Sequence, residues 1–202
     1  MSSPKHLRIG VFIPAGCQLL DMSGIDIFSV LSPEYLSACG LPAPLVALGI
    51  SCTIYYISLP STGPEVELTA NAFLRLSKTT KTNEVQPVAQ CGILKGLSAS
   101  GPRALIPRLK KEFSDTKWVD DRRWVVDGNI WSSGGITNGL EMIAAYIRQK
   151  FPSPAAEAVI AMADVGEKGV FYTNGNTNET LRWLWQILRA VGLGIGKDKK
   201  SR

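Results

Sequence analysis

Four cysteines and one histidine supply the thiol and imidazole groups of this 202-residue chain. A thiolate beside a base can attack a small electrophile, so each cysteine is a candidate nucleophile. No two cysteines have the CxxC spacing, and a single histidine completes no zinc ligand set, so we expect reduced thiols and no metal site. These residues are His6, Cys17, Cys39, Cys52 and Cys91.

Asp21 is a carboxylate within an otherwise apolar stretch, residues 18–31, which we predict to be a helix broken early at Ser23-Gly24. Two interpretations of Asp21 are open. It is either solvated on the polar side of the helix, or held in a cleft where it is desolvated and acts as a proton donor.

A glycine turn after a predicted hairpin is the second candidate site. Asp127-Gly128, between residues 122–126 and 129–133, is typical of a tight turn joining two strands. Gly134-Gly135 then leads into a predicted helix that ends near Phe151. Backbone N–H groups in such a turn, together with the helix N-terminus, can face a ligand.

The helix after this turn is predicted to be amphipathic. Thr137 or Asn138 is its expected N-cap, and Glu141 completes a capping-box pattern with Asn138. The apolar residues fall at helical spacing, so we expect one buried face and one wet face. The buried face comprises Leu140, Ile143, Ala144 and Ile147, and the wet face Glu141, Arg148 and Lys150.

The remaining elements predict an α/β fold whose parallel sheet is incomplete. Residues 7–13 form a continuous apolar run, expected for a parallel strand covered on both faces, and residues 53–59 and 66–69 are further strands. Residues 34–48 are expected to be a loop, and 102–113 and 155–163 helices. The polar segment 77–87 and the short segment 88–96 leave no room for the central strands that such a sheet needs.

Composition and charge favour one globular domain spanning residues 1–202, with its core in 7–164 and a helix and basic tail in 176–202. The net charge of +5 is concentrated in residues 103–111 and 197–202, a solvated helix and a tail, so we expect no nucleic-acid partner. No signal peptide and no run of roughly 18 apolar residues is present, so we expect a cytoplasmic protein without a membrane partner. The glycines of residues 192–196 follow a helix, not a strand, so we expect no cofactor.

Three segments resemble the DJ-1/PfpI (ThiJ/PfpI) superfamily, in particular its isonitrile-hydratase-like branch and fungal members. They are LRIGVFIPAGCQLLDMSGIDIFSVL (7–31), GILKGLSASGPR (92–103) and WVDDRRWVVDGNIWSSGGITNGLEM (118–142). The resemblance implies a flavodoxin-like, class I glutamine amidotransferase-like α/β sandwich, commonly a homodimer, that acts on a small-molecule substrate.

The resemblance also implies a catalytic arrangement, of which this chain has only part. Family enzymes hold a cysteine at a nucleophile elbow, in a pattern like VCTG, beside a carboxylate of the first helix. Asp21 matches that carboxylate by motif position, which favours an acid/base role. The elbow is missing and should lie between Pro87 and Val88. Residues expected to contact substrate are Gly16, Ser133, Gly134, Gly135 and Thr137.

The sequence leaves two questions open: which residue, if any, replaces the missing nucleophile, and what the protein does. Cys91 is expected to be a buried filler, and Cys17, in the loop before Asp21, is a candidate reactive thiol. Full-length relatives would hydrate or hydrolyse a small molecule, isonitrile hydration being the closest named activity. This chain could hydrate a small electrophile with Asp21, could be a non-catalytic dimeric ligand-binding or regulatory module, or could derive from a gene model that lacks an internal segment.

Overall fold

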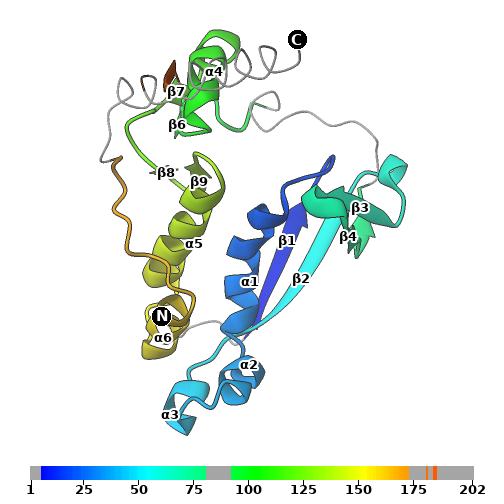
Figure 1. Cartoon of the computed structure of the whole chain (residues 1–202), viewed down its shortest axis with the longest axis vertical. Coiled ribbons are helices and arrows are strands. Elements are labelled where there is room, and N and C mark those ends of the chain that lie inside the picture. The colour runs from blue at the N-terminus through cyan, green and yellow to red at the C-terminus, as the bar shows by residue number, and fades with distance from the viewer. Residues whose placement is uncertain (1–5, 81–91, 173–180, 182–183, 186–202) are drawn as a thin grey trace, which may run out of the picture.

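The computed structural model describes residues 6–80 and 92–172, together with Leu181, Leu184 and Trp185 (Figure 1). The strands are β1 (His6–Phe12), β2 (Ser51–Ser58), β3 (Glu65–Leu68), β4 (Ala72–Arg75), β5 (Lys78–Thr79), β6 (Ser98–Ala99), β7 (Lys117–Trp118), β8 (Trp124–Asp127) and β9 (Ile130–Ser133). The α-helices are α1 (Ser23–Val30), α2 (Pro33–Ala38), α3 (Ala43–Val46), α4 (Ile106–Glu112), α5 (Ile136–Lys150) and α6 (Pro154–Met162). Short 3-10 helices are η1 (Leu19–Met22), η2 (Pro60–Thr62), η3 (Thr69–Asn71) and η4 (Arg103–Leu105).

Parallel strands occur in two separate pieces within the described residues. One is a sheet of order β1-β2-β5 and the other is the pair β6-β7. Two antiparallel hairpins, β3-β4 and β8-β9, complete the strands. The predicted α/β class and the incomplete parallel sheet are therefore confirmed. The junction at Pro87 and Val88, where the sequence lacks the central strands, lies outside the described residues, as does Cys91.

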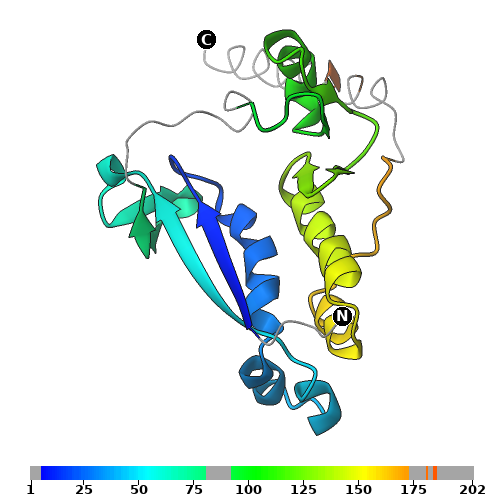
Figure 2. The same cartoon turned by 180° about the vertical axis from the view of Figure 1, so that it is seen from behind.

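The main core lies where α1, α5 and α6 pack together on one face of β1 and β2. Leu7 and Ile9 of β1 and Cys52 of β2 pack against this core, and Leu7 and Cys52 are register partners. The buried members of this core include Phe28, Leu31, Ala144, Ile147 and Ile160. Figures 1 and 2 show α1 between the sheet and α5, with α2 and α3 at one end of the molecule.

The expectation that the first strand is covered on both faces is wrong. Exposure alternates along β1, and Phe12 on the outward face is 48% exposed. Among the described residues, no helix packs on that face (Figures 1 and 2), although parallel strands of α/β proteins are normally covered on both faces.

The helix after the glycine turn is confirmed, but its cap is not the predicted one. Gly135, with φ of +97°, is the N-cap of α5. The Asn138 side chain instead donates to the Gly134 carbonyl and, at 3.0 Å, to the Tyr172 hydroxyl. A tertiary contact with Tyr172 thus replaces the expected local capping box.

Glu141 is buried at 5% exposure, which corrects its assignment to the wet face. Its carboxylate accepts main-chain N–H groups from Gly166 at 3.0 Å and Lys168 at 3.1 Å. The predicted apolar face is confirmed, since Ala144 and Ile147 are fully buried.

Other predicted elements agree with the structure except between residues 34 and 48. Strands 53–59 and 66–69 correspond to β2 and β3, helix 155–163 to α6, and helix 102–113 to η4 followed by α4. The predicted loop at 34–48 is wrong, because it contains α2 and α3. Each has a proline in its first turn, and Ser32 Oγ accepts the Tyr35 N–H at the start of α2.

The predicted last helix from Asn176 and the basic tail lie outside the described residues, apart from Leu181, Leu184 and Trp185, whose side chains are at least half exposed. No helix in the described part of the chain is long and apolar enough to cross a membrane.

Candidate functional site

A pocket of about 380 Å³ lies between the N-terminal ends of α1 and α5. Asp21 and Ser133 provide the polar side chains of its lining, and Gly135 contributes main chain at the N-cap of α5. Most of the other lining side chains are apolar, among them Ile25, Ile136 and Ile143. The pocket therefore suits a small, mainly apolar molecule with one polar group.

Glycines allow the helices that form this pocket to approach each other. A methyl group added at Gly24 of α1 would lie 3.2 Å from Ile143 Cγ1 of α5, so a larger residue would push the helices apart. Gly139 lines the pocket one turn into α5. A glycine within a helical pattern often has such a packing reason. Gly24 and Gly139 are therefore the sequence signal that could have located the apolar part of the pocket.

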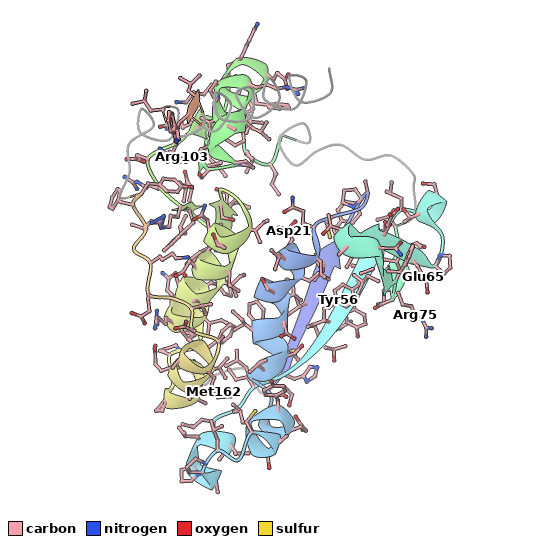
Figure 3. The ribbon with its side chains drawn as sticks, in the orientation of Figure 1. Asp21, Tyr56, Glu65, Arg75, Arg103 and Met162 are labelled. Atoms are coloured by element: carbon pink, nitrogen blue, oxygen red, sulfur yellow. The ribbon has the colours of Figure 1, made fainter. Side chains whose placement is uncertain are left out.

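Asp21 lines the pocket from η1, directly before α1 (Figure 3). It closes the η1 turn, where its N–H donates to the Gln18 carbonyl at 2.9 Å and its Oδ2 accepts the Gln18 N–H at 3.3 Å. Its side chain is exposed, which agrees with the solvated interpretation and not with a desolvated acid. A solvated carboxylate can still bind a polar group or assist a water molecule.

The structure separates the other predicted contact residues from this pocket. Gly134 is buried, and a methyl group added there would lie 2.6 Å from the Gly101 carbonyl oxygen. Thr137 is exposed and is not part of the pocket lining. Gly16 lines a different, shallower depression of about 420 Å³ together with Cys17 and Glu67. Of the six predicted site residues, the fold brings Asp21, Ser133 and Gly135 to one pocket.

No described cysteine lines the pocket. Cys17 is half-buried, and burial, followed by the negative charge of Asp21, raises the pKa of its thiol. Burial also raises the pKa of Cys52, whose thiol donates to the Phe28 carbonyl at 3.4 Å. Cys39 is exposed at the end of α2. The local environment thus disfavours the Cys17 thiolate, the form a nucleophile requires.

The raised pKa values of Cys17, Cys52 and Tyr56 predict a stability that falls at alkaline pH. Burial is the largest cause for Tyr56 as well, followed by the charges of Asp26 and Cys52. As pH rises, the unfolded chain releases these protons before the folded chain does, near pH 9.0 for the thiols and near pH 10.0 for Tyr56. The stabilisation is therefore complete below pH 9.0 and is lost as pH rises through the higher pKa values of the folded protein. Urea unfolding between pH 8 and 11 measures this loss. We expect Tyr56→Phe to flatten it above pH 10 and Tyr35→Phe, at an exposed tyrosine, to leave it unchanged; equal slopes in all three proteins would contradict the assignment.

Groups of three or more metal-ligating side chains are not found among residues 6–80 and 92–172. The pocket itself combines one carboxylate with one hydroxyl, which does not provide a metal ligand set.

Comparison with known proteins identifies the fold. No protein-family model matches the sequence, and no curated protein matches it either. Among solved structures, a ThiJ/PfpI family protein from Pseudomonas syringae has 13% identity and a TM-score of 0.58, covering 92% of this chain and 86% of that chain. DJ-1 from Schizosaccharomyces pombe has 10% identity and a TM-score of 0.53, covering 77% of this chain and 98% of that chain.

An AraC family transcriptional regulator from Pseudomonas putida is similar to the same degree, with 12% identity, a TM-score of 0.58, and 77% of this chain and 98% of that chain covered. At identities this low the similarity concerns the fold. The chain therefore has the DJ-1/PfpI-like α/β fold, also described as class I glutamine amidotransferase-like.

Proposed function

We propose that this chain, with its DJ-1/PfpI-like fold, binds a small molecule between α1 and α5 without a cysteine nucleophile. The observation that carries the proposal is the composition of the pocket, whose described lining combines Asp21 and Ser133 with apolar side chains and contains no thiol. Cys17, the described thiol nearest to Asp21 in sequence, lines a different depression. The chain would then serve as a ligand-binding or regulatory module.

The comparison with a transcriptional regulator supports a use of the fold other than catalysis. The Pseudomonas putida protein of similar fold is described as a regulator, and its whole length is nearly covered by this chain. A ligand-binding module needs a pocket, and the described residues form one between α1 and α5. We further propose that the module is a homodimer, which light scattering of the purified protein would test.

Hydration of a small electrophile, such as an isonitrile, is the second candidate. It is favoured by the position of Asp21 and Ser133 in one pocket, since a carboxylate could take a proton from water and a hydroxyl could orient the substrate. Addition of water to the isonitrile carbon would give an N-substituted formamide. Without a covalent intermediate, catalysis would depend on Asp21 alone as the base.

Ligand-dependent stabilisation of the wild-type protein and of Asp21→Asn separates the two candidates. With a simple isonitrile or the corresponding formamide at 100 times Kd, binding should raise the free energy of unfolding by about 2.7 kcal/mol. We expect stabilisation without turnover, weakened in Asp21→Asn and kept in Asp26→Asn, because Asp26 is exposed on α1 and outside the pocket lining. Formamide production that Asp21→Asn abolishes would favour hydration. The absence of both binding and turnover would contradict both candidates.

The transcript across the codons for Pro87 and Val88 tests the remaining alternative. A continuous transcript supports a protein that lacks the elbow. An intervening reading frame that encodes a strand and a VCTG-like elbow would show that the cell makes a cysteine enzyme, and would replace the proposal of a binding module.

A further inference from the structure

One face of the β1-β2-β5 sheet is open in this structure, and we call it the open face. It carries the even-numbered residues of β1 and the odd-numbered residues of β2, as shown by the His6–Thr53 hydrogen bond and by the contact between Gly10 and Ile57. The opposite face packs on the main core. In Figures 1 and 2, α1 lies on one side of β1 and β2, and no described helix lies on their other side.

The centre of the open face is apolar. Phe12 is 48% exposed, and Gly10 is exposed although it has no side chain, so the main chain of β1 is itself accessible. A methyl group added at Gly10 would lie 3.3 Å from Ile57 Cδ1, which places Ile57 beside the accessible main chain. Parallel strands with this composition are normally covered by helices on both faces.

Positive charge surrounds this apolar centre. The guanidinium of Arg8 lies 5.7 Å, and the ammonium of Lys78 4.3 Å, from the centroid of the Tyr55 ring. The strands β1, β2 and β5 contain no aspartate or glutamate. Within the described part of the chain, neither Arg8 nor Lys78 forms an ion pair. The charge on this face is therefore uncompensated.

We propose that the open face binds an amphipathic helix of another protein, with acidic residues beside its apolar stripe. A helix is the element that covers a parallel sheet, and carboxylates beside its apolar stripe would pair with Arg8 and Lys78. Phe12 and Ile57 would contact the apolar stripe.

Two other occupants fit the charge less well. The amphipathic C-terminal segment of this chain, around Leu181 and Trp185, carries Arg182 and Arg189, which would repel Arg8 and Lys78. A second copy of the chain would place two cationic faces together. Like charges placed opposite each other oppose association, so an acidic partner helix is favoured over both.

The test uses the full-length chain and two synthetic helical peptides that share one leucine stripe, flanked by glutamates in the first and by lysines in the second. Fluorescence anisotropy should show that the glutamate peptide binds at least about tenfold more tightly, with an affinity that falls as salt is added. Arg8→Glu combined with Lys78→Glu should reverse this preference, whereas Lys117→Glu, on the exposed β7, should not change it. Phe12→Ser should weaken binding of the glutamate peptide with its salt dependence retained.

We expect each variant to fold, because the substituted side chains are all exposed, and circular dichroism would check this. Equal binding of the two peptides, or a double variant that keeps the original preference, would overturn the proposal. It would also be overturned if, in competition, a peptide of residues 176–190 bound more tightly than the glutamate peptide. A dimer in light scattering that the combined Arg8→Glu and Lys78→Glu variant dissociates would overturn it too.

Discussion

Glu141→Ala is expected to lower the free energy of unfolding by roughly 3 kcal/mol, the largest loss we predict for a single substitution in this chain. The Glu141 carboxylate, 5% exposed, accepts the N–H groups of Gly166 and Lys168. Its removal leaves the N–H of the half-buried Gly166 and that of the exposed Lys168 without this acceptor. The segment after α6 then keeps the hydrogen bond from Arg148 of α5 to the Gly166 carbonyl, so its attachment to α5 is weakened. Hydrogen bonds to a charged group are worth more than neutral ones, which sets the size of the effect.

Thermal unfolding followed by circular dichroism measures this effect. A loss of 3 kcal/mol corresponds to a decrease in Tm of about 6–12 °C for a chain of this size. Glu112→Ala is the matched control, because its ion pair with Arg108 is exposed and should contribute less than about 1 kcal/mol. Equal decreases in Tm for the two variants would show that Glu141 does not anchor the segment.

Gly134→Ala is expected to destabilise the protein by about 1–3 kcal/mol through overpacking. The added methyl group would lie 2.6 Å from the Gly101 carbonyl oxygen and 3.0 Å from the Tyr172 hydroxyl. The nearer atom belongs to the main chain, so it cannot rotate away as a side chain would. The β9-α5 turn would have to move away from the strand-to-helix connection at Gly101.

Gly139→Ala, in the first turns of α5 just after this turn, provides a control of opposite sign. There the methyl group would lie 3.4 Å from Ser133 Oγ, an ordinary contact, and alanine is a better helix former than glycine by up to about 1 kcal/mol. Urea unfolding should therefore place the wild-type midpoint between those of the two variants. A stable Gly134→Ala variant would mean that the turn has room for a side chain, as the interpretation of Gly134 as a ligand-facing residue requires.

Much of the local structure could be predicted from the sequence, because its signals span only a few residues. Asp127-Gly128 predicts the β8-β9 hairpin, and the spacing of Leu140, Ala144 and Ile147 predicts the buried face of α5; the structure confirms both. The α2 and α3 helices were missed, because each is only one or two turns long and the prolines near them were interpreted as loop signals.

The candidate site could be predicted only in part, because membership of a pocket depends on how distant elements pack. Asp21 and Ser133 are far apart in the sequence, and both line one pocket because α1 and α5 approach each other at Gly24. Gly134 and Thr137 belong to the same turn as Gly135, but one is buried against Gly101 and the other faces solvent. Neighbouring positions in a turn point in different directions, so proximity in sequence does not place them in one pocket.

Three features could be predicted from the residues alone: the α/β class, the hairpin before α5 and the incomplete parallel sheet. These follow from strand and helix periodicity and from the polar segment 77–87 and the short segment 88–96, which leave no room for central strands. Three other features depend on how distant elements pack: the burial of Glu141, the pocket lined by both Asp21 and Ser133, and the open face of the β1-β2-β5 sheet. Burial is set by which elements cover a surface, and those elements come from distant parts of the chain.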